Sequence, residues 1–390
     1  MVLSKSIWLK TAFVAGLALT SLFPTVSMLP ISSSYAAEVV QGTIVSPTTV
    51  TKLPKVQVIA TGGTIAGQSV DETSFQNYKA GTLLMEDMVK ALPNKDQIAD
   101  VSTFQFGNKG SGSYTMQQLY DLSLKVDEVL ETQDGVVVTT GTDTMEEIAY
   151  FLDLTVRSPK PVVITGSMRP WTVIGSDAQA NLYNAIKLAA SGKTKYFGTV
   201  LMLNDEFHAA REVTKTNGNR TDTFETPKLG MLGYIDEKNI RLYRANARSL
   251  MSTDTWATPF DLKKIPSTSL AKVEIAYAYQ DAGAGAITGL VEEGAKGIVT
   301  AGTGSGGVSK AMGDARTKAF KEKGIIFVAT TRTGSGSNYS TGDGIIAGDN
   351  LNAAHARVLL LLSLSFSSDF NTIKGWFDTY GSAQIVIPEK

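Results

Sequence analysis

The chain has 390 residues and a nearly balanced charge, with 36 Lys and Arg against 37 Asp and Glu, so it lacks the basic excess that favours nucleic-acid binding. It contains no cysteine and only two histidines, which excludes disulfides, zinc-thiolate sites and a thiol nucleophile. Catalysis would therefore have to use hydroxyl, carboxylate and amine groups, and we predict neither a metal site nor a cofactor.

The first 36 residues have the pattern of a secretory signal peptide. Lys5 and Lys10 precede an apolar run at 11–23, and the stretch closes on small residues at 34–36, which is typical of a cleavable leader. The apolar run is shorter than the roughly 20 residues that a membrane-spanning helix needs. We expect residues 1–36 to be removed and the mature protein to be periplasmic or secreted, with no membrane partner.

From residue 53 onward, short apolar runs alternate with helical patterns. Strands are expected at 56–60, 135–140, 161–165 and 199–204, with helices near 83–91, 144–156 and 178–190. Such alternation predicts a mostly parallel sheet flanked by helices. We assign this α/β series to an N-terminal domain at 53–243.

A second, smaller series of the same class follows at 271–380. Its expected strands are 273–279, 297–301 and 325–330, and its expected helices lie near 284–293, 309–322 and 353–366. Between the two series, residues 244–270 are polar with weak periodicity, which predicts a linker crossing the surface. The expected fold is therefore α/β with two domains, a larger N-terminal and a smaller C-terminal one.

The segment TGGTIAG (61–67) directly follows the first expected strand. Its two glycines allow a sharp turn that would expose the hydroxyl of Thr64 beside free backbone N–H groups. Those are the parts of a nucleophile with an oxyanion site. An ordinary glycine turn or a phosphate cradle remains possible, although the loop lacks the GK[ST] ending of a P-loop.

The segment TTGTDTMEE (139–147) ends another strand and opens a helix. It displays the hydroxyl of Thr142 and the carboxylate of Asp143 at the carboxyl end of the strand, where ligands of parallel sheets bind. Helix capping is the alternative explanation, but only one residue caps a helix. The segment therefore predicts a polar site.

The segment REVTKTN (211–217) places Lys215 among hydroxyl-bearing residues. Burial in a site would lower the pKa of this lysine, so that it could take a proton from a threonine at neutral pH. A solvated loop charge is the alternative interpretation.

These three motifs, with TGSMRP (165–170), NLYNAI (181–186) and LNAAHARVLL (351–360), resemble in order and spacing the asparaginase and glutaminase-asparaginase family over about residues 53–380. The resemblance implies hydrolysis of the side-chain amide of L-asparagine to L-aspartate and ammonia. It also implies a homotetramer built from intimate dimers, with each active site completed by the neighbouring subunit.

The resemblance further assigns roles to residues of this chain. It makes Thr64 the primary nucleophile, activated by Tyr78 on a mobile loop, and Thr142, Asp143 and Lys215 a second catalytic group. Among substrate contacts, it implies that Ser111 binds the α-carboxylate and Asp143 the ammonium, while Asp281 would enter the partner's active site.

Two departures from the family pattern bear on selectivity. Gly112 stands where relatives commonly carry Gln or Glu, and a glutamate expected after 332–336 has no counterpart. Lost contacts to the substrate's α-groups predict a preference for asparagine with weak glutaminase activity. A periplasmic glutaminase-asparaginase of broad specificity is the alternative.

Two further classes of protein stay open. Gly302, Gly304 and Gly307 form a dinucleotide-type fingerprint, and Glu322 follows at a suitable distance. A periplasmic solute-binding protein for small amino acids would also have a leader, two α/β domains and a ligand cleft.

Overall fold

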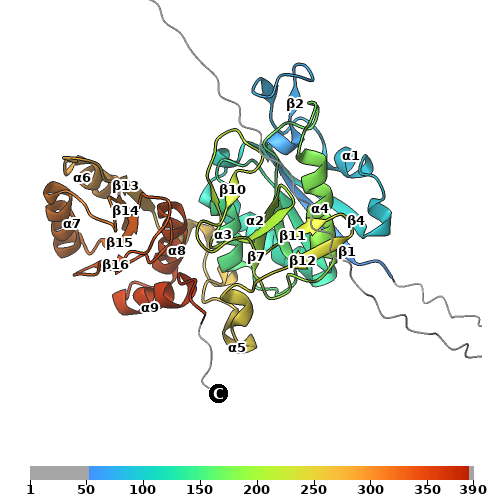
Figure 1. The fold of residues 1–390 in the computed structure, drawn as a ribbon. Coiled ribbons are helices and arrows are strands. Elements are labelled where there is room, and N and C mark those ends of the chain that lie inside the picture. The colour runs from blue at the N-terminus through green and yellow to red at the C-terminus, as the bar shows by residue number, and fades with distance from the viewer. Residues whose placement is uncertain (1–51, 386–390) are drawn as a thin grey trace, which may run out of the picture. The chain divides into compact units, whose positions relative to one another are not determined.

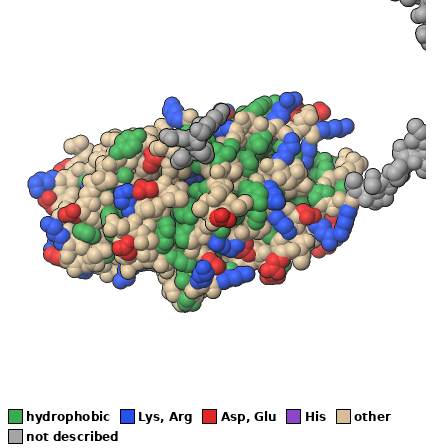
Figure 2. Space-filling model, turned by 90° about the horizontal axis from the view of Figure 1, so that it is seen from below, with side chains coloured by type: hydrophobic (Ala, Val, Ile, Leu, Met, Phe, Trp, Pro, Cys, Tyr) green, Lys and Arg blue, Asp and Glu red, His purple; other side chains and the backbone are tan. Residues whose placement is uncertain are grey.

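The computed structural model describes residues 52–385, so the predicted signal peptide lies outside the described residues. Within 52–385, none of the helices combines the length and the apolar character that crossing a membrane requires. On the face that Figure 2 shows, Lys and Arg side chains are interspersed with Asp and Glu, in keeping with the nearly balanced charge of the sequence.

The larger sheet contains eight strands, and its core is parallel (Figure 1). The strand order is β12 (Asn239–Leu242), β11 (Gly233–Asp236), β8 (Glu206–Ala209), β7 (Thr199–Leu203), β6 (Val162–Thr165), β5 (Gly135–Thr139), β1 (Lys55–Gly62) and β4 (Asp100–Lys109). The pairs from β4 to β7 are parallel, whereas β8, β11 and β12 add antiparallel pairs at one edge. The prediction of a mostly parallel sheet is confirmed.

Helices cover both faces of this sheet because its central strands are apolar on both faces. In β5, Val136 and Val138 belong to the apolar cluster that contains α2 (Met116–Thr132) and α3 (Met145–Thr155), while Val137 belongs to the cluster that contains α1 (Met85–Lys90) and α4 (Ala178–Ala190). Alternate side chains of a strand point to opposite faces. A strand buried on both sides therefore reads as a continuous apolar run.

The second sheet has four parallel strands, in the order β13 (Val273–Tyr277), β14 (Gly297–Gly302), β15 (Ile326–Thr331) and β16 (Ile345–Ala347). Its helices are α6 (Gly285–Glu292), α7 (Lys310–Lys323), α8 (Ala353–Phe366) and α9 (Phe370–Tyr380). α6 and α7 share one apolar cluster, while α8 packs into the cluster that also contains α2 and α3. The prediction of a second, smaller α/β series is thus confirmed.

The segment 244–270 is not the surface crossing that its polar composition predicted. It contains a short helix, α5 (Thr253–Trp256), and buries Trp256, Phe260 and Leu262. The Phe260 ring lies 5.2 Å from the ring of Trp376, centroid to centroid. These large apolar side chains anchor the segment, but their irregular spacing produces no period that the sequence could reveal.

The chain order of the parallel strands fixes where a ligand should bind. From β1 the chain runs to β4 on one side, then returns to β5 on the other side of β1. Outside the carboxyl ends of β1 and β5 the connections therefore diverge, and in such sheets ligands occupy this switch point. The loops that carry Thr64 and Thr142 follow these two strands.

Candidate active site

Two glycines bring the loops after β1 and β5 into direct contact. Gly62 and Gly63 have φ angles of 102° and 83°, which side chains rarely adopt. A Cβ atom added to Gly63 would lie 2.2 Å from the backbone N of Gly141. Only glycine allows this approach, which sets Thr64 beside the loop that carries Thr142.

Thr64 is hydrogen-bonded to a tyrosine from a short hairpin. Its Oγ1 lies 2.7 Å from the hydroxyl oxygen of Tyr78, in β3 (Tyr78–Lys79), which pairs with β2 (Gln68–Ser69). A Cβ on Gly67 would come within 2.8 Å of the Tyr78 ring, so this glycine makes room for the tyrosine. The predicted Thr64–Tyr78 pairing is present in the structure.

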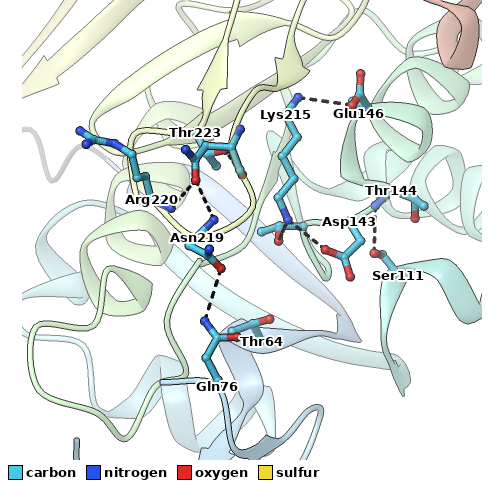
Figure 3. A network of polar contacts seen from close by, with 12 residues as sticks. Thr64, Gln76, Ser111, Asp143, Thr144, Glu146, Lys215, Asn219, Arg220 and Thr223 are labelled. Atoms are coloured by element: carbon cyan, nitrogen blue, oxygen red, sulfur yellow. Dashed lines mark hydrogen bonds and ion pairs between the residues drawn. The ribbon is translucent and has the colours of Figure 1, made fainter. Parts of the chain in front are cut away.

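The hairpin is held over Thr64 by contacts to other loops. The backbone N–H of Ser69 donates to Thr172 Oγ1 at 2.9 Å, and Gln76 Nε2 donates to Asn219 Oδ1 at 3.5 Å (Figure 3). The bond from Ser69 is partly buried. These contacts hold the hairpin, and with it Tyr78, against the threonine.

Lys215 joins Thr142 and Asp143 into one polar cluster. Its Nζ donates to Thr142 Oγ1 and to Asp143 Oδ1, each at 2.9 Å (Figure 3). The Lys215 side chain is 14% exposed, whereas that of Asp143 is 85% exposed. The ammonium is thus largely enclosed, while the carboxylate stays accessible to a cationic ligand.

Capping does not account for the polar residues before α3. Thr144 is the N-cap residue, and its side chain makes no capping hydrogen bond. Its backbone N–H instead donates to Ser111 Oγ at 3.1 Å, which brings the buried Ser111 to the cluster. At the next residue, Gly112, an added Cβ would meet open space.

Glu146 connects this cluster to α8, and the sequence did not predict this connection. Its Oε1 accepts the backbone N–H of Lys215 at 3.3 Å, and its Oε2 accepts from Asn352 Nδ2 at 2.8 Å. His355 Nε2 lies 3.6 Å from the same Oε2. The only local signal was that Asn352 precedes a helix, where asparagine is a favoured cap.

The His355 ring is neutral at pH 7. Burial is the main reason why the pKa of His355 is lowered to about 4; Glu146 opposes this shift, and the positive charge of Arg211 adds to it. The neutral ring therefore serves packing, and its centroid lies 5.1 Å from that of the Tyr150 ring. Between residues 52 and 385, no group of three or more His, Asp or Glu side chains is placed to hold a metal ion.

The lowered pKa of His355 predicts a loss of stability in mild acid. As the pH falls from 6.5 towards about 4, the unfolded chain binds a proton that the folded state rejects. The stabilisation is complete above pH 6.5 and is lost as the pH falls, by up to about 3 kcal/mol. We expect His355→Gln to remove this part of the pH dependence.

Urea unfolding at pH 7 and at pH 4.5 measures this effect. The difference in unfolding free energy between the two pH values should be smaller in His355→Gln than in the parent. Between pH 7 and pH 8 the two proteins should behave alike, which serves as the internal control. Equal losses in both proteins on acidification would contradict the assignment.

Asp281 lies apart from the other predicted site residues. It follows β13 in the second sheet, is exposed and has a φ of 58°, a conformation that aspartate tolerates better than most residues. Among the described residues of one chain, no hydrogen bond or ion pair joins Asp281 to Thr64, Thr142 or Lys215. The structure therefore brings together Thr64, Tyr78, Ser111, Thr142, Asp143 and Lys215, but not Asp281.

Internal packing explains the glycine fingerprint at 302–307. A Cβ on Gly302 would lie 2.3 Å from the carbonyl carbon of Gly306, and one on Gly306 would overlap the Asn338 amide. Thr303 and Gly307 form a β-bridge across the turn. These glycines permit a tight loop without any need for a nucleotide.

Fold and site define the class of protein: a two-sheet α/β enzyme whose reactive groups are hydroxyls, a carboxylate and an amine. The chain belongs to the asparaginase family. The family model "Asparaginase, N-terminal" matches residues 55–248, and the model "Glutaminase/Asparaginase C-terminal domain" matches residues 272–377.

Individual relatives match over most of their length. The chain is 42% identical to L-asparaginase 2 of Bacillus subtilis, covering 84% of this chain and 87% of that protein. It is 38% identical to a protein of Haemophilus influenzae named "Probable L-asparaginase periplasmic", covering 84% and 93%. Among solved structures, "Probable Cytoplasmic L-asparaginase" from Campylobacter jejuni matches with a TM-score of 0.79 and 38% identity, covering 84% and 100%.

Proposed function

We propose that this enzyme hydrolyses the side-chain amide of L-asparagine to L-aspartate and ammonia. The observation that carries the proposal is the juxtaposition, at the switch point of the large sheet, of the Thr64–Tyr78 pair and the Lys215–Thr142–Asp143 cluster. The names of the relatives support the same reaction.

The proposed reaction has two steps. In the first, Thr64 Oγ1 attacks the amide carbon, its proton is transferred to the leaving nitrogen, and the C–N bond breaks to release ammonia. In the second, water attacks the acyl-enzyme ester, which releases aspartate and restores the hydroxyl. Tyr78 orients and activates Thr64, and the Lys215–Thr142 pair assists proton transfer.

The substrate's charged groups find complementary partners in the same cluster. Asp143, exposed and paired with Lys215, would pair with the α-ammonium. Ser111 Oγ accepts a hydrogen bond from Thr144 N–H, so its own hydroxyl hydrogen is free to donate to the α-carboxylate. Thr142 and adjacent backbone N–H groups would stabilise the oxyanion.

We also propose an assembly and a location. The exposure of Asp281 supports its entry into a partner's active site, within a homotetramer built from intimate dimers. The ranges of the two family models support domains at 53–243 and 271–380 joined by 244–270. The leader-like sequence and the periplasmic relative support a periplasmic or secreted enzyme, although one structural relative is named cytoplasmic.

Ammonia release from L-asparagine tests the proposed function. The purified protein should release one ammonia per asparagine consumed and form aspartate. A solute-binding protein would bind asparagine, seen by calorimetry, without releasing ammonia. Binding without turnover would overturn the proposal, and comparable kcat/KM for glutamine would instead favour the glutaminase-asparaginase of broad specificity.

Gly112 predicts the direction of selectivity. The parent should prefer asparagine, because no side chain at this position helps to hold the α-groups of the longer substrate. We expect Gly112→Gln to raise kcat/KM for glutamine by about 10-fold, the value of one hydrogen bond to a charged group. The open space beyond an added Cβ indicates that the change is sterically tolerated.

Gly112→Ala is the matched control, since it adds a Cβ in the same space without an amide. Coupled assays of both substrates should show the gain in the glutamine variant alone. No gain in that variant, or an equal gain in both, would contradict the role of this position.

A further inference from the structure

We propose that Glu146, held by Asn352 of α8, is the positioning residue that fixes the catalytic lysine. The inference rests on the proposed function, in which Lys215 assists proton transfer. It adds that Asn352, at the start of α8, acts through Glu146 to determine where the Lys215 ammonium lies. Within the described residues, Asn352 makes no hydrogen bond to Thr64, Thr142 or Asp143.

Glu146 binds the backbone of Lys215 directly. Its side chain is 13% exposed, and its Oε1 accepts the Lys215 N–H at 3.3 Å (Figure 3). A hydrogen bond to a carboxylate is stronger than one between neutral groups. The contact therefore acts on the main chain at the point from which the lysine side chain extends towards Thr142.

Lys215 needs such an anchor because its own strand is very short. β9 (Thr214–Lys215) pairs only with β10 (Phe224–Glu225), in a two-stranded sheet separate from the eight-stranded one. An isolated pair of short strands is marginally stable. The large sheet therefore does not hold Lys215 by its own hydrogen bonds.

Asn352 fixes the orientation of the Glu146 carboxylate. As the N-cap of α8, its Oδ1 accepts the backbone N–H of His355 at 2.8 Å. With the amide oxygen engaged in the cap, Nδ2 faces Glu146 and donates to Oε2 at 2.8 Å. Both ends of the amide are used, so the start of α8 determines where Oε1 meets Lys215.

Glu147 offers a matched comparison within the same helical turn. Its carboxylate lies 3.5 Å from Nη1 of Arg357, another residue of α8, and burial raises its pKa. It thus also links α3 to α8, but it makes no hydrogen bond or ion pair with Lys215 within residues 52–385. A change at Glu147 perturbs the same packing without touching the lysine's anchor.

The test compares Glu146→Gln, Asn352→Asp and the double variant. Glu146→Gln places an amide donor against the Asn352 amide, and Asn352→Asp places a second carboxylate against Glu146. In each single variant we therefore expect kcat for asparagine to fall about 10-fold, with KM changing less than about 3-fold. In the double variant, the introduced amide at 146 can donate to the introduced carboxylate at 352, which still caps α8. We expect kcat to return to within about 3-fold of the parent.

Glu147→Gln is the control and should leave kcat within about 2-fold of the parent. Thermal unfolding of each variant shows whether a fall in kcat merely follows lost stability, since Glu147→Gln should lose comparable stability without losing kcat. If a single variant does not fold, the comparison of the double variant with the parent still decides whether the swapped pair supports turnover.

Unchanged kcat in both single variants, or a double variant no better than the singles, would overturn the positioning role. A rise in KM with kcat unchanged would do the same, because it would assign the network to substrate binding. Failure of the proposed function is distinguishable, since the parent itself would then release no ammonia before any variant is compared.

Discussion

Thr64→Ala should abolish useful turnover, lowering kcat for asparagine by at least about 10³-fold. The substitution removes the hydroxyl oxygen that lies 2.7 Å from Tyr78 and leaves the glycine turn that presents it. No covalent acyl-enzyme can then form, and the remaining cluster can only bind substrate. Ammonia release at saturating asparagine measures the effect, and circular dichroism verifies that the variant is folded.

Thr64→Ser is the matched control, because it keeps a hydroxyl at the same position and loses only a methyl group. It should retain turnover well above that of the alanine variant. If the alanine variant kept kcat near the parental value, Thr64 would not be the nucleophile, and the two-step mechanism would have to be abandoned.

Amphipathic helical patterns and continuous apolar runs made the fold predictable. The expected helices near 144–156 and 353–366 appear as α3 and α8, and the apolar runs at 135–140 and 297–301 appear as the buried strands β5 and β14. In each of these segments the local pattern and the tertiary environment agree. Burial on both faces of a central strand requires an apolar run.

The longest helix of the described chain, α2, was not predicted, although the sequence contains its signals. Thr115 and Gln118 form a capping box, and Leu119, Leu122 and Val126 recur at helical spacing on the buried face. The antiparallel edge strands β8, β11 and β12 carry weaker signals. Each of these strands has only four residues, too few for a reliable period.

Local motifs pointed to Thr64, Thr142, Asp143 and Lys215, whereas Tyr78 and Ser111 were inferred from the family resemblance. Residues that follow the carboxyl ends of neighbouring parallel strands must meet at one edge of the sheet, and Thr64 and Thr142 do so. The pairing of Glu146 with Asn352 could not be predicted in this way. The two residues are 206 positions apart, and a contact between single side chains at such a distance leaves no periodic trace in the sequence.

Lys215→Met should reduce kcat for asparagine by about 10²- to 10⁴-fold, the usual contribution of a positioned acid–base group. Methionine fills a similar volume, so the enclosed path of the side chain stays packed. Thr142 Oγ1 and Asp143 Oδ1, however, each lose a donor now at 2.9 Å. The expected loss lies in kcat more than in KM, because the proposed contacts of Asp143 and Ser111 with the substrate's α-groups would remain.

Lys79→Met is the matched control for the lost charge. Lys79 is exposed and adjoins Tyr78 in the hairpin over the site, so its replacement removes an ammonium from the hairpin without touching Thr142. Steady-state kinetics of both variants separate a general effect of charge from proton transfer by one lysine. Similar kcat in the two variants would refute the catalytic role of Lys215. A loss confined to Lys215→Met requires the ammonium to act through Thr142 and Asp143, the only side chains to which Lys215 Nζ is bonded within residues 52–385.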